Sequence, residues 1–475
     1  MKKEVEQTIK ESLIQALKSH KKNDFKVAES LYKKYLKSFP NDVVAYNNLG
    51  ILFFQFKENQ KAISSYEKAI KINPNYAEAY NNLGVVFKLL GDYESAVSSY
   101  EKAIKINPNY AEAYNNLGSV YKELKEYYKA KDFYENAIKF KPNYLEGHNN
   151  LGVVFKLLGD YKSAVSSYEK AIKINPNYTV SLNNLGSVFY ELGEYNKSKS
   201  CYKKSIKANP NNPDAYWNEQ AFAANIDEAL ALLKKLFIID NKNIKAKIML
   251  SVLQTYKGNP HRTEDLLPLQ LSNHPFVRSA KWIFSLPKLP KIFFNRLDFF
   301  DAIIALSDNS RPFYEFGVWN GVSFKHLIKT FKKGFGFDTF SGLPEAWHKM
   351  PKGSYSSFGE IPKIEGGEFV AGKFEDTLPD FFSKERSLAS LINFDADLYS
   401  STLCALNYSN KVIDEKTILI FDELIMNENW EQDEFKALNE FCDNSGMTYE
   451  VIAFSFFTGQ VALRTIKKLK ANNST

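Results

Sequence analysis

The chain has 475 residues, which is too long for a single hydrophobic core, so two or three domains are expected. Apolar residues make up 44% of it and aromatic residues 15%, which excludes a largely disordered chain. The net charge of +7 comes from lysines that alternate with glutamates, a pattern typical of solvated helical faces. It does not resemble a nucleic-acid footprint, so no nucleic-acid partner is expected.

Cysteine usage and the N-terminus indicate the compartment. Cys201, Cys404 and Cys442 lie far apart with no CxxC spacing, which favours a reducing environment over a disulfide framework or a zinc site. Charged residues interrupt the first 17 positions, so they do not form a signal peptide. No stretch reaches the roughly 18 apolar residues that span a bilayer. The sequence therefore predicts a cytoplasmic protein without a membrane span.

The first half repeats itself. Proline recurs every 34 residues, at positions 40, 74, 108, 142, 176 and 210. A Leu-Gly pair, a small residue and a tyrosine keep the same phase, as in Gly84, Ala96 and Tyr100. This pattern predicts a pair of antiparallel helices per repeat, in which the glycine allows close approach and the tyrosine fills space between repeats. It resembles the tetratricopeptide (TPR) repeat and predicts an all-α solenoid over residues 1–257, its last unit degenerate.

An Asn-Asn pair precedes each Leu-Gly, at positions 47, 81, 115, 149 and 183. One asparagine of each pair is predicted to face the concave groove, where a ladder of amides could bind the backbone of an extended peptide. The arrangement resembles the asparagine ladder of the O-linked N-acetylglucosamine transferase repeats. Alternatively, these asparagines satisfy backbone groups between repeats. A protein or peptide partner on the concave face is therefore expected.

Beyond residue 210 the repeat decays. Amphipathic helices are predicted at 225–237 and 244–256. Prolines and aromatic residues then alternate, which indicates a packed connecting and capping segment over 258–297. A helix at 298–307, with Asp298 as its N-cap, opens a third region over 298–475.

In this third region short β-rich runs alternate with amphipathic stretches, which predicts an α/β, Rossmann-like fold with a mostly parallel sheet. Seven strands are expected, the last two as an antiparallel hairpin at one edge. They lie at residues 312–316, 335–338, 368–371, 388–395, 417–422, 449–454 and 459–464.

A glycine turn follows the first of these strands. Gly317 and Gly321 permit a tight turn and close approach of a ligand at the start of a helix. Asp338 ends the second strand, 23 residues after Glu315, where a carboxylate can accept hydrogen bonds from ribose hydroxyls. A third glycine in the dinucleotide-binding frame is missing. The spacing therefore favours a nucleoside such as S-adenosylmethionine (SAM) over a dinucleotide.

Five segments, at 314–323, 337–345, 372–379, 392–402 and 419–423, together with Trp430 and Glu434, resemble class I SAM-dependent methyltransferases. More narrowly, they resemble the macrocin O-methyltransferase (TylF) type, which methylates sugar hydroxyls. The likeness covers about residues 311–465. The residues expected to bind SAM are Glu315, Gly317, Trp319, Gly321, Ser323, Asp338, Thr339, Phe374, Glu375 and Asp395.

Four carboxylates end the two neighbouring strands at 388–395 and 417–422. They belong to Asp395, Asp397, Asp422 and Glu423. Carboxylates that converge in this way repel one another unless a cation lies among them, and an oxygen-rich site suits Mg²⁺. The resemblance implies a metal role for Asp395, Asp422 and Glu423, the last at a position where relatives tend to have Asp. Alternatively, all four are helix caps and loop acids.

Methyl transfer to a hydroxyl also needs a group that removes its proton. Asp395 and Asp397 are the expected catalytic acids, and Asp397 is a base, a ligand or a helix cap. His348 is a further candidate base in the loop 343–367, which could form a lid over the acceptor.

The leading hypothesis is a SAM-dependent O-methyltransferase that acts on a sugar, glycan or related hydroxyl, with the repeats binding a protein. One alternative is an interaction scaffold whose methyltransferase fold is inactive. Another is a methyltransferase that acts on protein or lipid.

Overall fold

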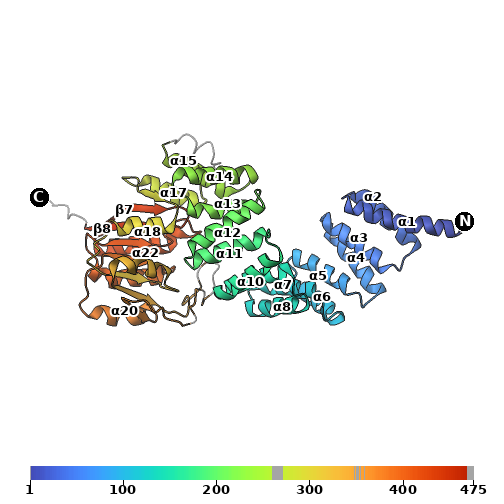
Figure 1. The fold of residues 1–475 in the computed structure, drawn as a ribbon, viewed down its shortest axis with the longest axis horizontal. Helices are drawn as coiled ribbons and strands as arrows, with labels where there is room; N and C mark the ends of the chain where they lie inside the picture. The colour runs from blue at the N-terminus through green and yellow to red at the C-terminus, as the bar shows by residue number, and fades with distance from the viewer. Residues whose placement is uncertain are drawn as a thin grey trace. The chain divides into compact units, whose positions relative to one another are not determined.

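The computed structural model describes residues 2–258, 271–346, 348, 352–353, 355–357 and 359–467. The chain divides into two compact units, Met1–Pro176 and Asn177–Thr475 (Figure 1). The division falls inside the region predicted as repeats, so the last repeat helices belong to the same unit as the sheet. No helix within the described ranges is long and apolar enough to cross a lipid bilayer.

The first unit consists of helix pairs, as the 34-residue period predicts. Its helices are α1 Lys2–Lys21, α2 Phe25–Ser38, α3 Val43–Gln55, α4 Asn59–Ile72, α5 Ala77–Leu89, α6 Tyr93–Ile106, α7 Ala111–Glu123, α8 Tyr127–Phe140, α9 Leu145–Leu157 and α10 Tyr161–Ile174. Several begin at an aspartate that satisfies a backbone N–H of the first turn. The Asp42 carboxylate, for example, accepts from the amide of Ala45 at 2.9 Å.

The repeat glycines and tyrosines pack face to face. A Cβ added at Gly84 would lie 2.8 Å from the Tyr100 ring, so only glycine lets α5 and α6 approach this closely. Tyr100 is fully buried and shares a cluster with Leu117 and Val120 of the next repeat. The tyrosine therefore fills space both within its own repeat and towards the next one.

The asparagine pairs join successive repeats of the first unit through their side chains. The Asn82 amide donates to the Asn47 carbonyl at 3.0 Å, and Asn116 donates to Asn81 at 3.0 Å. The first asparagine of each pair is buried and the second is half-buried. These bonds link amide to amide, so the asparagines stabilise the stack by a route that neither interpretation of the sequence included.

The second unit opens with helices that continue the repeat and then depart from it. They are α11 Thr179–Glu191, α12 Tyr195–Ala208, α13 Pro213–Glu219, η1 Gln220–Phe222, α14 Ile226–Ile239, α15 Ile244–Tyr256 and α17 Pro275–Ser285. The helices predicted at 225–237 and 244–256 are confirmed as α14 and α15. Of the predicted connecting segment, residues 259–270 lie outside the described residues. The rest is packed: Val277 and Ile283 of α17 are buried in the largest hydrophobic cluster.

The sheet has eight described strands in the order β1-β7-β8-β6-β5-β2-β3-β4, all parallel except that β8 runs antiparallel to β6 and β7. The strands are β1 Lys291–Phe293, β2 Phe313–Phe316, β3 Gly334–Asp338, β4 Gly367–Ala371, β5 Leu391–Phe394, β6 Ile418–Phe421, β7 Met447–Ser455 and β8 Val461–Lys467. The helices of this part are α18 Arg296–Ile304, α19 Val322–Phe331, α20 Phe374–Ser383, α21 Tyr399–Ser409, η3 Asn410–Val412, η4 Trp430–Gln432 and α22 Glu434–Ser445.

Two expectations about the sheet were wrong. The sheet contains an eighth strand, β1, in addition to the seven predicted ones, and its three residues are too few to show a pattern in the sequence. The β7–β8 hairpin is not an edge, because β1 covers β7 and β8 pairs with β6. The predicted mostly parallel, Rossmann-like architecture is confirmed. Neighbouring residues Phe313 and Tyr314 belong to separate buried clusters, so both faces of the sheet are covered.

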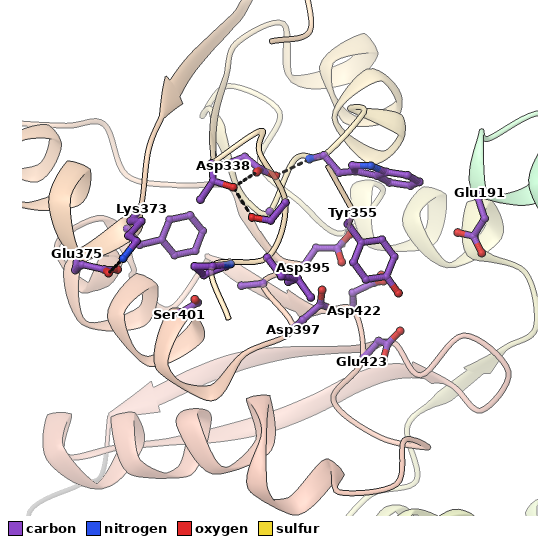
Figure 2. A pocket seen from close by; sticks show the side chains of 18 of the residues that line it. Glu191, Asp338, Tyr355, Lys373, Glu375, Asp395, Asp397, Ser401, Asp422 and Glu423 are labelled. Atoms are coloured by element: carbon purple, nitrogen blue, oxygen red, sulfur yellow. Dashed lines mark hydrogen bonds and ion pairs between the residues drawn. The ribbon is translucent and has the colours of Figure 1, made fainter. Parts of the chain in front are cut away.

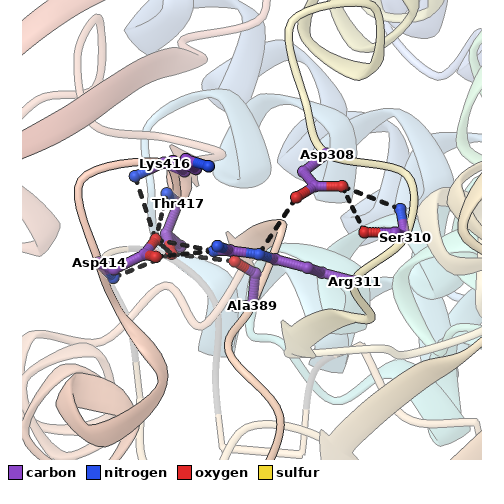
Figure 3. A network of polar contacts seen from close by, with 7 residues as sticks. All are labelled: Asp308, Ser310, Arg311, Ala389, Asp414, Lys416 and Thr417. Atoms are coloured by element: carbon purple, nitrogen blue, oxygen red, sulfur yellow. Dashed lines mark hydrogen bonds and ion pairs between the residues drawn. The ribbon is translucent and has the colours of Figure 1, made fainter.

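A network of polar contacts fastens the ends of β2, β5 and β6 opposite their carboxyl ends (Figure 3). The Arg311 guanidinium contacts both carboxylate oxygens of Asp414 at 2.9 Å. Asp414 also accepts from the backbone N–H of Thr417 at 3.1 Å, and the Thr417 hydroxyl donates to the Ala389 carbonyl at 2.9 Å. This network holds the strand starts together and leaves the opposite ends free for a site.

Stacked phenylalanines align the carboxyl ends of four strands. Phe316 of β2 stacks on Phe337 of β3 at 4.8 Å between ring centroids and on Phe394 of β5 at 5.4 Å. Phe394 in turn stacks on Phe421 of β6 at 4.8 Å. These residues pair in register across the sheet. The residue after each ring therefore emerges at the same edge.

Candidate active site

The residues that follow the four rings are Gly317, Asp338, Asp395 and Asp422, and all four line one cavity of about 210 Å³ (Figure 2). The other residues that line it are Glu191, Arg296, Trp319, Thr339, Gly342, Leu343, Pro344, Tyr355, Lys373, Phe374, Glu375, Ala396, Asp397, Ser401 and Glu423. The sheet thus gathers predicted cofactor, catalytic and metal residues at one edge.

Gly317 cannot be replaced without moving the floor of the cavity. Its φ is +90°, and a Cβ there would lie 1.8 Å from the backbone oxygen of Asp395. Three non-glycine residues that line the cavity also have left-handed backbones: Trp319, Tyr355 and Asp397, with φ of +48°, +57° and +60°. Strained residues of this kind cluster at functional sites.

Asp338 fastens the glycine turn. Its Oδ2 accepts from the backbone N–H of Val318 at 2.8 Å and of Trp319 at 2.7 Å, and its Oδ1 accepts from Phe340 at 2.7 Å. Burial raises the pKa of this carboxyl, while the backbone donors oppose the rise. The turn amides that would otherwise face a ligand phosphate are therefore already bound to a carboxylate. The Thr339 hydroxyl lies 3.5 Å from Oδ1 but donates to the Gly342 carbonyl at 2.7 Å, so Oδ1 keeps room for one further donor.

Three predicted SAM contacts do not line the cavity. Glu315 is fully buried behind the turn, where its Oε1 accepts from the Ser323 hydroxyl and from the Asn393 amide. Burial raises the pKa of Glu315 to about 8, and within the described structure its Oε2 has no hydrogen-bond partner. Gly321, with φ of +72°, begins α19 away from the cavity. These residues shape the turn from behind.

Arg296 lies among the carboxylates. One of its Nη atoms is 2.8 Å from Asp422 Oδ1 and 3.3 Å from Asp395 Oδ2, and Gln460 donates to the same Asp422 oxygen at 2.6 Å. Burial and neighbouring acids raise the pKa of Asp395, which Arg296 partly offsets. The pKa of Glu423 rises to about 8 for the same reasons. The cation that the clustered acids require is therefore supplied by the chain.

The pairing with Arg296 bears on the predicted metal site. Asp395 and Asp422 converge on Arg296 instead of on an open position. Across the described ranges, no three His, Cys, Asp or Glu side chains are arranged to hold a metal ion. In this arrangement Arg296 lies where a Mg²⁺ ion would have to contact Asp395 and Asp422, so these side chains do not form the predicted site as they stand. Whether the chain binds Mg²⁺ stays a prediction.

Asp397 lines the cavity but does not cap a helix. α21 begins after Leu398, and no side chain caps it. Burial and the neighbouring Glu423 raise the pKa of Asp397 well above its usual range. A carboxylate with a raised pKa is a stronger base, which suits a role in proton removal.

His348 is not among the residues that line the cavity. Its Nε2 lies 2.9 Å from the Asp433 carboxylate, just before α22. The structure therefore gives no support to its predicted role as base. Of the predicted lid, Leu343, Pro344 and Tyr355 line the cavity, whereas residues 347, 349–351, 354 and 358 lie outside the described residues.

The sequence missed Arg296 because it misplaced the start of α18. The true N-cap is Asn295, whose side chain accepts from the amides of Leu297 at 2.8 Å and Asp298 at 3.1 Å. Asp298, the predicted cap, lies in the first turn. Asn295, two residues before the first apolar residue of the helix, Leu297, was a signal that the sequence offered. Glu191 and Lys373 had no comparable signal.

The helical part of the chain matches known repeat proteins. Models described as TPR repeat match residues 52–91, 86–125 and 186–218, and models described as tetratricopeptide repeat match 111–144, 145–178 and 167–199. No curated protein matches the chain.

Solved structures with similar helical parts include MamA, 31% identical over 36% of this chain and 92% of the MamA chain, with a TM-score of 0.32. PilF of Pseudomonas aeruginosa is 22% identical over 46% of this chain and 96% of its own, with a TM-score of 0.40. YrrB, described as a TPR protein with an unusual peptide-binding site, is 22% identical over 39% of this chain and 95% of its own, with a TM-score of 0.33. Residues 52–218 of the chain therefore form a tetratricopeptide repeat array.

Proposed function

We propose that the α/β part of the chain is a SAM-dependent O-methyltransferase and that the repeat array binds a protein or peptide. Arrays of this kind present extended concave binding surfaces. The observation that carries the proposed activity is the bonding of Asp338 to the amides of the glycine turn. A carboxylate on those amides disfavours a ligand phosphate and leaves an acceptor for a ribose hydroxyl.

The charges that line the cavity also favour SAM. Seven acidic side chains line it against two basic ones, Arg296 and Lys373, and this excess of acids favours a sulfonium over a phosphate. The Phe374 ring after β4 offers an apolar surface for a nucleobase. Bound SAM would supply an electrophilic methyl group.

The residues of the chain would then position the acceptor and take its proton. Holding the acceptor hydroxyl in line with the methyl group requires fixed walls, which the stacked strand ends provide. Asp397 and Glu423 are the bases within the cavity, because burial raises the pKa of both. Arg296 would hold the carboxylates of Asp395 and Asp422 in fixed directions.

Calorimetric titration with SAM tests the proposal. We expect a Kd in the micromolar range for the parent chain. Asp338→Asn should raise this Kd at least tenfold, because the asparagine amide cannot accept from all the backbone donors that Asp338 binds. Asp376→Asn, an exposed acid in the first turn of α20, serves as the matched control and should bind as the parent does. Absence of binding at millimolar SAM would instead favour a scaffold whose methyltransferase-like fold is inactive, since the repeats alone account for an interaction role.

Metal dependence is tested separately. With Arg296 between the two aspartates, methyl transfer is expected to persist in excess chelator. Loss of turnover that added Mg²⁺ restores would show that Arg296 yields its place to a metal ion, as the sequence predicts. The preference for a sugar or glycan acceptor over a protein or lipid one comes from the family resemblance. Turnover assays on representatives of each class would decide it.

A further inference from the structure

A second cavity, of about 300 Å³, adjoins the first. Both are lined by the same four residues, Glu191, Arg296, Asp422 and Glu423. The remaining residues that line the second cavity are Ser187, Tyr190, Tyr202, Trp217, Asn218, Ala221, Phe457 and Thr458. The two cavities therefore meet at the carboxylates that Arg296 bridges.

The wall of this second cavity comes largely from repeat helices. Glu191 ends α11, Tyr202 lies on α12 and Trp217 on α13, all within the compact second unit. These helices pack closely on the α/β part. A Cβ at Gly193, in the turn after α11, would lie 2.7 Å from the Val322 side chain, and the Trp217 and Phe457 rings are 6.0 Å apart. Figure 2 shows Glu191 reaching towards the first cavity from the repeat side.

The lining of the second cavity suits a hydroxylated ring. The faces of Trp217 and Phe457 offer apolar surface, while Ser187, Asn218 and Thr458 offer donors and acceptors. Polar groups beside aromatic faces would stabilise a ligand with several hydroxyls.

The charges narrow the class of ligand. The acids Glu191, Asp422 and Glu423 face this cavity, against the single cation Arg296. A ligand that carries a phosphate or sulfate here would be repelled, whereas an amine would be attracted. An uncharged or amine-bearing ring therefore fits best.

We infer that the last TPR repeat and α13 form the acceptor side of the active site, and that the acceptor is an uncharged or amine-bearing hydroxylated ring held between Glu191, Trp217 and the Asp422–Glu423 edge. This inference rests on the proposed methyl transfer. It makes the array part of the catalytic unit as well as an interaction surface, because the repeat helix places a carboxylate at the junction of the two cavities.

Saturation-transfer NMR on the full chain tests the inference in the presence of enough S-adenosylhomocysteine to fill its binding site. The three probes are methyl glucoside, glucosamine and glucose 6-phosphate. We expect signals for the first two and none for the phosphate. Glu191→Gln should weaken glucosamine binding at least fivefold, and Trp217→Ala should weaken both signals at least tenfold. Glu194→Gln serves as the matched control, because Glu194 pairs with Lys197 at the surface and lines neither cavity.

The affinity for S-adenosylhomocysteine, measured for every variant, separates the two claims. Unchanged cofactor binding with unchanged probe binding in Glu191→Gln and Trp217→Ala would overturn the inference and leave the proposed function standing. Binding of glucose 6-phosphate as tight as that of glucosamine, or of no probe at all, would also overturn it. Failure of the parent chain to bind the cofactor would defeat the proposed function instead.

Discussion

Arg296 sets the charge state of the residues that would carry out the chemistry. It lies within 3.3 Å of Asp395 and 2.8 Å of Asp422, and its charge lowers the pKa of Asp395 and of Glu423. Arg296→Met should therefore raise both pKa values. If Asp395 must be charged or Glu423 must accept a proton, the acid limb of the pH profile of kcat will move to higher pH.

The conservative Arg296→Lys is the control for this prediction. It keeps the charge and should leave the acid limb near its original place, with a smaller loss of rate. An acid limb that stays fixed in Arg296→Met, with only a uniform loss of rate, would mean that the arginine acts through packing alone.

The raised pKa of Glu315 should make the free energy of unfolding depend on pH. Its pKa in the folded chain is about 8, because burial disfavours the charged form, against about 4.3 in an unfolded chain. For an acid with a raised folded pKa, the stabilising contribution is complete below the unfolded value and is lost as the pH rises through the folded value. Relative to Glu315→Gln, the parent should lose up to about 1.4 kcal/mol per pH unit between about pH 4.5 and 8.

Thermal melts of both proteins across that range measure the difference. Glutamine keeps an oxygen for the Ser323 hydroxyl and the Asn393 amide, so the two proteins should differ mainly in titration. A constant gap in Tm from pH 5 to 8 would show that Glu315 does not titrate in this window.

At the scale of elements, the turn between β2 and α19 requires glycine at position 317 because a side chain there would collide with the backbone of Asp395. Gly317 and Gly353 have nearly equal φ, +90° and +87°, so alanine carries a similar backbone strain of about 1–2 kcal/mol at each. A Cβ at Gly353 meets nothing within 4 Å, whereas at Gly317 it meets the Asp395 carbonyl at 1.8 Å. Gly353→Ala should keep SAM affinity, and Gly317→Ala should lose it.

Calorimetry on the two variants, with melts to confirm folding, checks this pair. Equal effects would mean that backbone strain, and not the approach of β2 to β5, accounts for the need for glycine.

The elements also show what the sequence could and could not predict. The 34-residue period predicted the repeats, and short β-rich runs between amphipathic stretches predicted seven strands. β1 was missed because three residues carry no period, and its pairing with β7 depends on contacts distant in sequence. The acids after β5 and β6 were found since strand ends converge. Arg296 and Glu191 reach the site from helices outside the strand-end pattern, so only the packed structure brings them there.

At the scale of the whole molecule, the chain divides into its two compact units at residue 176, so the helices between residues 177 and 257 share a unit with the sheet. Leu233 of α14 and Leu253 of α15 are fully buried, and they share one hydrophobic cluster with Tyr314 and Phe316 of β2. Removing the helices before residue 258 would expose this apolar surface, and each lost large side chain removes about 1.5–3 kcal/mol of burial free energy.

Two truncations therefore have opposite expected outcomes. Residues 177–475 should fold with a cooperative melt and keep the SAM affinity of the full chain, because both cavities lie within this unit. Residues 258–475 should aggregate or melt without cooperativity. If the shorter piece folds and binds SAM as tightly as the longer one, the helices α11 to α15 are an attachment and not a structural part of the catalytic unit. If residues 258–475 alone also bind the hydroxylated ring probes, the last repeat does not form part of the acceptor site.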